Sequence, residues 1–114
     1  MEFAVKKFEQ CNVITIFGRV DSYTAPNIDT LLKSLISEHQ TNIVIDLEKV
    51  SSLSSSGLLV FVNAQKSLNK QKCSKIRFSG TSELIFSAFS LAGFDKLFDF
   101  YANTTSALES FREF

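Results

Sequence analysis

Five serines fall within residues 51–57 (SSLSSSG), between two segments of different character. Before them, residues 42–47 (NIVIDL) form a short apolar run rich in β-branched residues, which predicts a strand that continues towards Val50. After them, apolar residues recur at helical intervals and predict a helix over residues 56–69. The sequence therefore places a loop of hydroxyl groups at a helix N-terminus.

Hydroxyl groups at that position can do two kinds of chemistry. A serine side chain can cap backbone N–H groups that have no partner within the helix. One hydroxyl can also accept a phosphate, because the N–H groups and the positive end of the helix dipole favour a negative charge there. One cap needs a single serine, and this loop has more. Capping alone and phosphate acceptance both remain open on these residues.

Signatures of enzymes, metal sites and cofactor sites are missing from the sequence. It contains no GxGxxG or GxxxxGK[ST] phosphate loop, no HExxH or CxxC motif and no GxSxG elbow. His39, the single histidine, falls on the apolar stripe of a predicted helix, where we expect a structural role. Cys11 and Cys73 are expected to be small core or edge residues. We therefore expect a protein that is not an enzyme and that holds no cofactor or metal.

The composition predicts one domain over residues 1–114. This length is near the usual domain size, and 45% hydrophobic residues, including 12 Phe, are enough to build a core. Lys and Arg together number 12 and balance 12 Asp and Glu, so the formal charge gives no attraction to nucleic acid or anionic membranes. No apolar run is long enough for a signal peptide or a membrane span. A cytoplasmic protein is expected.

The first half of the chain predicts a hairpin followed by an amphipathic helix. Residues 3–8 and 13–17 have strand composition, and their short connection predicts an antiparallel pair. Gly18 is expected to end the second strand, and Pro26 suits the first turn of the helix after a polar loop. The inward face of that helix is predicted to carry Ile28, Leu31, Leu32, Leu35, Ile36 and His39.

Two further predicted strands, residues 75–78 and 97–101, enclose a third helix. Gly80 and Glu83 have the spacing of a weak capping pair that would begin this helix, and Gly93 suits the residue that ends it. Its inward residues are expected to be Leu84, Ile85, Ala88, Phe89 and Ala92.

A final helix is expected near the C-terminus, where Ser106 and Glu109 form a capping box. Its inward residues would be Ala107, Leu108, Phe111 and Phe114. The resulting order, β-β-α-β-α-β-α-β-α, predicts an α/β fold. We expect a mixed β-sheet, with an initial antiparallel hairpin and later parallel strands, covered by about four helices.

The polar residues that follow predicted strands should meet at one edge of this sheet. In such folds the strand ends and the helix N-termini that follow them usually face the same rim. Asp21 follows the second strand, and the serines at residues 54–56 follow the third, so this rim is the default site. Leu58 and Leu59 lie next to it and are candidate partner contacts, although the helix must bury at least one of them.

Taken together, these segments resemble the STAS domain family, the anti-sigma-factor antagonists of bacteria. Three segments carry the resemblance: GRVD and TAP at residues 18–21 and 24–26, DL and SSSGL at 46–47 and 54–58, and LAGFDKLF at 91–98. They are similar to the family's first loop, its DL…DSSGL signature and its closing LTGLDKLF segment. The match runs in collinear order from about residue 3 to residue 111.

The resemblance implies a phosphoprotein that regulates transcription by switching partners. In the family, an anti-sigma factor that is also a serine kinase binds the unphosphorylated antagonist, phosphorylates it and releases it, and a separate serine phosphatase resets it. No direct contact with nucleic acid or membrane is implied. By position the acceptor is Ser55, with Ser56 and Ser54 as fallbacks. The residues implied in partner binding are Asp21, Ser54, Ser56, Gly57, Leu58 and Leu59.

Two positions depart from the family pattern. The acidic residue just before the acceptor is Ser54 here, and the glycine that usually follows Gly57-Leu58 is Leu59. Because this carboxylate is missing, a second hypothesis stays open. The protein could be a STAS scaffold or interaction module, itself not phosphorylated, in a signalling or transport complex. A third reading is a binder of nucleotides or small anions at the helix N-terminus.

Overall fold

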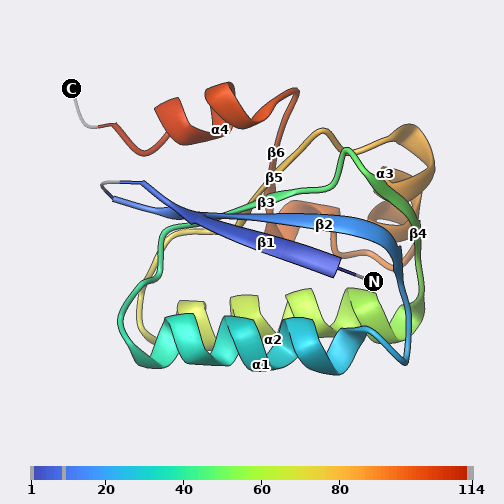
Figure 1. Cartoon of the computed structure of the whole chain (residues 1–114), viewed down its shortest axis with the longest axis horizontal. Coiled ribbons are helices and arrows are strands. Elements are labelled where there is room, and N and C mark those ends of the chain that lie inside the picture. Colours follow the sequence, from blue (N-terminus) through green and yellow to red (C-terminus); the bar gives the residue numbers. More distant parts are fainter. Residues whose placement is uncertain (1, 9, 113–114) are drawn as a thin grey trace.

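The computed structural model describes residues 2–8 and 10–112 (Figure 1). Its elements follow in the order β1 (Glu2–Lys7), β2 (Asn12–Val20), α1 (Ala25–Ser37), β3 (Ile43–Asp46), β4 (Val50–Leu53), α2 (Ser55–Lys70), β5 (Arg77–Ser79), α3 (Glu83–Leu91), η1 (Asp95–Leu97), β6 (Asp99–Tyr101) and α4 (Thr104–Glu109). The predicted alternation is confirmed, and two short elements are added to it, the strand β4 and the 3-10 turn η1.

The strands form one mixed sheet whose main path is β1-β2-β3-β5-β6. β1 runs antiparallel to β2, whereas β3, β5 and β6 continue the sheet as parallel strands. β4 lies off this path and pairs in parallel with the last part of β2. Both features of the predicted sheet, the initial hairpin and the later parallel strands, are confirmed.

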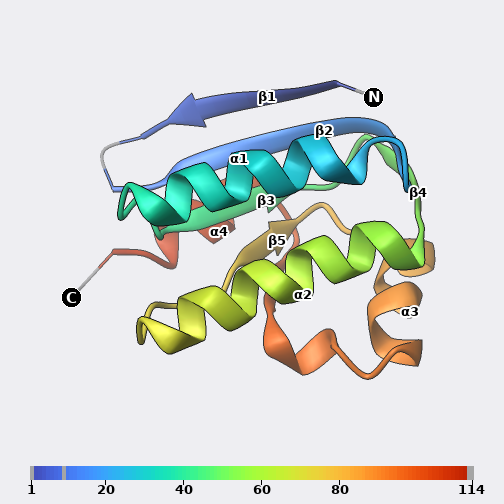
Figure 2. The ribbon, with the colours of Figure 1, turned by 90° about the horizontal axis from the view of Figure 1, so that it is seen from below.

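Helices cover both faces of this sheet unequally. Figure 1 shows α1 and α2 on one face and the short α4 on the other, and Figure 2 shows α1 and α2 running side by side. α3 lies beside the N-terminal end of α2 in both views and contacts β4. The start of α2, β4 and α3 therefore occupy the same end of the molecule.

Phenylalanines form the centre of the core beneath α2 and α3. Phe61, Phe78 and Phe89 are fully buried. The ring centroid of Phe78 lies 5.1 Å from that of Phe61 and 5.0 Å from those of Phe89 and Phe98. Because edge-to-face aromatic pairs add about 0.5–1.5 kcal/mol to the free energy gained by burial, Phe78 joins β5 firmly to both helices.

The serine-rich segment is only partly a loop. Ser51, Ser52 and Leu53 belong to β4, which runs beside the end of β2. Gly18 therefore does not end β2 as predicted: the strand continues to Val20, and the positive φ of Gly18 (85°) accommodates a register shift at that point. β4 escaped prediction because its two exposed serines break the apolar pattern that marks a strand.

α1 ends before it reaches His39. The last residue of the helix is Ser37, and His39 adopts a left-handed φ of 60°. Its N–H donates to the carbonyl of Ile36 (3.1 Å), which closes the helix end. His39 is exposed, so the expectation that it lies on the apolar stripe is wrong. The other residues of the predicted stripe are buried or partly buried: Ile28, Leu31, Leu32, Leu35 and Ile36.

Two helices begin with caps other than those predicted. The hydroxyl of Ser82 caps α3 by accepting a 3.2 Å hydrogen bond from a backbone N–H of the first turn, in place of the Gly80–Glu83 pair. The side chain of Asn103 caps α4 by accepting a 2.8 Å bond from the N–H of Ser106, so Ser106 lies inside that helix. Both caps have extended backbones, the geometry in which serine and asparagine are preferred.

α3 buries only a narrow face. Ile85 and Phe89 are buried, but Leu84 is 71% exposed and Ala92 is exposed as well. The prediction that Leu84 and Ala92 point inward is therefore wrong. The cause is the position of α3 at one end of the sheet, where it contacts β4 and η1 on one side and leaves its outer side uncovered.

The predicted end of α3 and the predicted inward residues of the last helix are confirmed where they are described. Gly93 has a left-handed φ of 81° and terminates α3. In α4 and just beyond it, Ala107 is buried and both Leu108 and Phe111 are partly buried, whereas Phe114 lies outside the described residues. None of the helices in the described part of the chain is long and apolar enough to cross a membrane.

We expect Phe78→Ala to lower the free energy of unfolding by about 3–5 kcal/mol, because it removes a fully buried ring and leaves a cavity. Urea unfolding followed by circular dichroism measures this loss. Phe86→Ala is the matched control, since Phe86 also belongs to an edge-to-face pair, with Phe100, but is 38% exposed. Equal losses in the two variants would contradict the central position of Phe78.

Candidate functional site

Two parallel strand ends lie side by side at the candidate site. Val20 of β2 pairs with Leu53 of β4, and the N–H of Ser54 donates to the carbonyl of Val20 (2.8 Å). Asp21 and Ser54 are therefore the first residues beyond two adjoining strands. The structure brings the aspartate loop and the serines together at one rim of the sheet, as the topology predicted.

Ser54 is the N-cap of α2. Its Oγ accepts a hydrogen bond from the N–H of Gly57 (3.2 Å), and its carbonyl accepts one from the N–H of Leu58 (2.9 Å). Its extended backbone (φ −83°, ψ 171°) is the usual N-cap geometry. The hydroxyl of Ser54 therefore already has a structural role.

Ser55 and Ser56 occupy the first two positions of α2, and both are exposed. Within the described residues, neither hydroxyl has a hydrogen-bond partner, and the backbone N–H groups of these two residues have no acceptor. The first turn of α2 also contains no acidic residue. The helix start thus combines accessible hydroxyls with N–H donors and an uncompensated dipole, which suits a group that becomes negatively charged.

Gly57 lets α2 approach the strand ends closely. A Cβ atom at this position would lie 2.5 Å from Val20 Cγ1 and 2.8 Å from Leu53 Cδ1, closer than van der Waals contact allows. Gly57 is buried, so it does not itself offer a surface to a partner. Its role in the site is to hold the first turn of α2, and with it the serines, against β2 and β4.

The carboxylate of Asp21 organises the turn that leads into α1. Oδ1 accepts hydrogen bonds from the N–H groups of Tyr23 (3.0 Å) and Thr24 (3.2 Å), and Oδ2 lies 3.3 Å from Arg19 Nη2. Desolvation opposes the charged form, but these hydrogen bonds and the guanidinium outweigh it and lower the pKa of Asp21. Asp21 therefore stays ionised and fixes the loop beside the serines.

The two leucines after Gly57 have different environments. Leu58 is buried in the core, whereas Leu59 is 49% exposed next to the serines. Of the two predicted contacts, only Leu59 therefore presents substantial surface to a partner.

Other exposed apolar side chains near this end were not predicted as contacts. Tyr23 is 89% exposed in the turn after β2, and Leu91 on α3 is 90% exposed. We call Tyr23, Leu59, Leu84 and Leu91 the apolar rim, because the turn, the start of α2 and α3 lie at the same end of the molecule (Figures 1 and 2). The sequence signal for its α3 part is that residues 83–91 (ELIFSAFSL) are apolar on more than one face, which a single buried stripe does not require.

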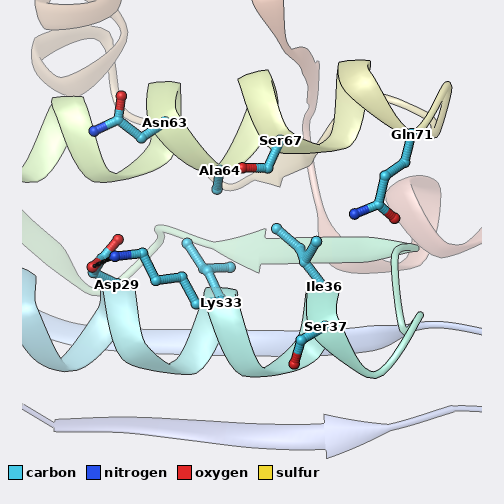
Figure 3. A pocket seen from close by; sticks show the side chains of 9 residues that line it. Asp29, Lys33, Ile36, Ser37, Asn63, Ala64, Ser67 and Gln71 are labelled. Carbon is cyan, nitrogen blue, oxygen red and sulfur yellow. Dashed lines mark ion pairs between the residues drawn. The ribbon is translucent and has the colours of Figure 1, made fainter.

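A hollow of about 270 Å³ lies between α1 and α2 (Figure 3). Ile36 points across it from α1 towards α2, where Ala64 and Ser67 are too small to fill the space. The ion pair between Asp29 and Lys33 (2.8 Å) lies at its border. None of the predicted site residues lines this hollow.

Metal chemistry has no support among the described residues, where no group of three or more His, Cys, Asp or Glu side chains could hold an ion. Cys11 is buried, and desolvation raises the pKa of its thiol despite the opposing charge of Arg77. A thiol in that state is poorly reactive. Cys73 is partly buried, and both cysteines are free, as their predicted structural role requires.

The comparison with protein families identifies the class of protein to which this chain belongs. Residues 2–107 match the family model of the STAS domain, which is most of the chain. The chain belongs to the STAS domain family.

Named relatives with similar sequences define the class of protein more closely. The anti-sigma-B factor antagonist of Listeria monocytogenes is 35% identical over 86 residues, which cover 75% of each chain. The protein of the same name from Staphylococcus aureus is 31% identical over 84 residues, which cover 74% of this chain and 77% of the relative. The chain therefore groups with the anti-sigma factor antagonists of the STAS family.

Solved structures show the same fold. The Bacillus protein SpoIIAA in its phosphorylated form superposes with a TM-score of 0.78 at 19% identity, covering 97% of this chain and 100% of that chain. SpoIIAA in its unphosphorylated form gives a TM-score of 0.77 at 17% identity, covering 96% of each chain. At these identities the likeness establishes the fold alone.

We expect Gly57→Ala to lower the free energy of unfolding by roughly 1–3 kcal/mol, because the added methyl group overpacks the contact with Val20 and Leu53. Thermal or urea unfolding measures the change. Ser56→Ala, one residue earlier and exposed, is the control and should change stability far less. Wild-type stability in Gly57→Ala would show that the helix or these two side chains can adjust at no cost.

We expect Asp21→Asn to be less stable than the wild type at pH 7, with a difference that disappears in acid. The folded state lowers the pKa of Asp21, so its charged form stabilises the fold above the unfolded pKa of about 3.9, and this contribution is lost as pH falls through the folded pKa. Urea unfolding across this pH range measures the effect. A difference of the same size at every pH would contradict a role for the charge.

Proposed function

We propose that this chain is an anti-sigma factor antagonist that works by partner switching. In its unphosphorylated form it binds a cognate anti-sigma factor, which is also a serine kinase. Phosphorylation of a serine in the loop at residues 54–56 releases it, and a serine phosphatase restores the binding form. The proposed action is cytoplasmic and involves no direct contact with nucleic acid or membrane. The names of the Listeria and Staphylococcus relatives support this proposal.

The observation that carries the proposal is that the three serines have different environments and different hydrogen bonds. Ser54 caps α2, whereas Ser55 and Ser56 are exposed and their hydroxyls have no partner among the described residues. A kinase can therefore reach Ser55 without uncapping the helix. We take Ser55 as the acceptor by its position in the family signature, with Ser56 as the first fallback and Ser54 as the last.

The serine in place of the family's acidic residue is compatible with this switch. Position 54 is an N-cap, and serine and aspartate are both strongly preferred there. The substitution therefore keeps the cap and removes one negative charge from the loop. This supports the partner-switching hypothesis over the hypothesis of a scaffold that is not phosphorylated, because the latter depends on the loss of the acidic residue.

Phosphorylation at Ser55 would change binding without requiring a new fold. A phosphate adds about 1.5–2 negative charges, and the N–H groups and dipole at the start of α2 can accommodate them. A partner packed against the same hydroxyl would instead have to desolvate the phosphate. A loss of 100- to 1,000-fold in affinity needs only about 2.7–4 kcal/mol. The superposition of this chain on SpoIIAA in both phosphorylation states supports a shared fold for the two forms.

The apolar rim supports a partner surface around the serines. Its side chains are 49–90% exposed, and they belong to the turn after β2, to α2 and to α3, which lie at the same end of the molecule as the loop (Figures 1 and 2). Exposed apolar side chains gathered in one region are typical of protein interfaces. We propose that the anti-sigma factor covers this rim and Ser55 together, so that a charge at Ser55 falls inside the interface.

Incubation with the cognate anti-sigma factor kinase and ATP tests the proposal. Intact-mass and peptide mapping should find one phosphate on wild type, at Ser55. Ser55→Ala should lose the label and bind the kinase permanently, and Ser55→Asp should bind at least about tenfold more weakly because it places a charge at the interface.

Ser56→Ala is the matched control, because it removes the neighbouring exposed hydroxyl and should keep the label. A label that survives Ser55→Ala but disappears in Ser56→Ala would move the acceptor by one residue. If the wild type binds the kinase tightly but gains no phosphate, the protein is instead a scaffold that is not phosphorylated.

A further inference from the structure

A second hollow, of about 500 Å³, lies between the start of α3 and the end of β6, and we call it the α3–β6 hollow. Its walls include Thr81, Glu83, Phe86, Ser87, Phe100 and Tyr101. Pockets for small ligands measure about 300–1,000 Å³ and combine apolar walls with a few polar groups, and this hollow has both features. None of the predicted site residues lines it, so a ligand bound there would not occupy the serine site.

Two phenylalanine rings form a corner of this hollow. The rings of Phe86 and Phe100 are nearly perpendicular (81°), their centroids are 5.0 Å apart, and neither side chain is fully buried. Two rings at this angle present one ring face on each side of the corner, and ring faces attract cations because they are electron-rich. Tyr101 adds a third aromatic side chain to the walls. The aromatic part of the hollow therefore suits a positively charged group.

Three side chains supply oxygen atoms to the same walls. Among the described residues that line the hollow, Glu83 alone carries a charge, and the other two, Thr81 and Ser87, carry hydroxyl groups. In the part of the chain that the structure describes, Thr81 Oγ1 is the one buried side-chain polar atom without a hydrogen-bond partner, which is an unusual state. Because Thr81 lines the hollow, rotation about its Cα–Cβ bond can turn this hydroxyl towards a ligand.

We propose that the α3–β6 hollow binds a primary alkylammonium ion. An –NH₃⁺ group has three donors and no acceptor, which matches the carboxylate of Glu83 and the two hydroxyls as three acceptors. The charged hydrogen bond to the carboxylate is the strongest of these contacts, and the ring faces of the corner attract the same charge. The alkyl chain packs against the apolar walls.

Other classes of ligand fit the hollow less well. An anion would meet the negative charge of Glu83. The dipole of α3 would favour an anion, but the Ser82 cap and the acidic first turn offset it. A neutral ligand would leave the carboxylate without a countercharge, and a quaternary ammonium ion would leave the hydroxyls without a donor.

An NMR titration of the full chain with butylammonium chloride tests the proposal, with ionic strength held constant by sodium chloride. Backbone amide shifts should change saturably, and the changes should be confined to residues 81–87 and 100–102, which border the hollow. Two probes separate the contributions, since 1-butanol has the chain without the charge and tetramethylammonium has the charge without N–H donors. Both should bind at least about tenfold more weakly than butylammonium.

Variants of the walls assign the contacts. Glu83→Gln removes the charge at constant size and should weaken butylammonium binding by at least about tenfold. Glu109→Gln makes the same change at an exposed glutamate outside the hollow and should leave the affinity unchanged. Phe86→Leu stays apolar but loses the ring face, so it should weaken binding about two- to fivefold, whereas Phe86→Tyr should not.

Thr81→Val separates a role in ligand binding from a role in the fold. It replaces the hydroxyl by a methyl group of similar size. Because that hydroxyl has no partner within the described residues, the variant should be at least as stable as the wild type in urea unfolding. It should nevertheless bind butylammonium about two- to tenfold more weakly.

Four results would overturn the proposal. They are the absence of saturable shifts with butylammonium at millimolar concentrations, equal affinity for 1-butanol, equal effects of Glu83→Gln and Glu109→Gln, and a Thr81→Val variant that loses stability but keeps its affinity.

Discussion

The close contact between the first turn of α2 and the ends of β2 and β4 determines the geometry of the site. Gly57 is buried against Val20 and Leu53, and a larger residue would force these side chains or the helix to shift. The same contact region holds the hydrogen bond from the N–H of Ser54 to the carbonyl of Val20. The serines are thus attached to the rigid part of the sheet, although they lie at its surface. A group modified there changes the surface of the domain while its support stays in place.

The regular parts of this fold were accessible from the sequence because their patterns are strong. The apolar spacing of α1 and the β-branched run of β3 each determine one element, and the alternation of strands and helices implies the mixed sheet. The elements that escaped prediction have weak patterns. β4 contains two exposed serines, and α3 is apolar on more than one face, so its pattern does not distinguish the exposed Leu84 from a core residue. In both cases tertiary contacts at one end of the sheet, which no local pattern reports, decide the outcome.

Local sequence patterns also do not determine the role of each single residue in the candidate site. The sequence identified the loop, the adjacent aspartate and the helix start, since strand ends and helix N-termini share a rim in such folds. It did not separate the three serines, because capping depends on backbone angles that only the structure provides. It also does not indicate that Gly57 is buried and closely packed against Val20 and Leu53. Tyr23 had no sequence signal, since one aromatic residue in a polar turn is common.

In the proposed switch, the serine at the cap of α2 also determines how much the charge of the helix start would change on phosphorylation. With no acid in the first turn, the unmodified helix start is electrically positive, and a phosphate would reverse its sign. An aspartate cap would begin from a negative state, and a phosphate would only deepen it. Mobile ions screen exposed charges over about 8 Å at physiological ionic strength, so such a reversal is felt by a molecule in direct contact and hardly beyond. In the proposed switch, the change of charge would therefore act on a partner that is in direct contact with the start of α2.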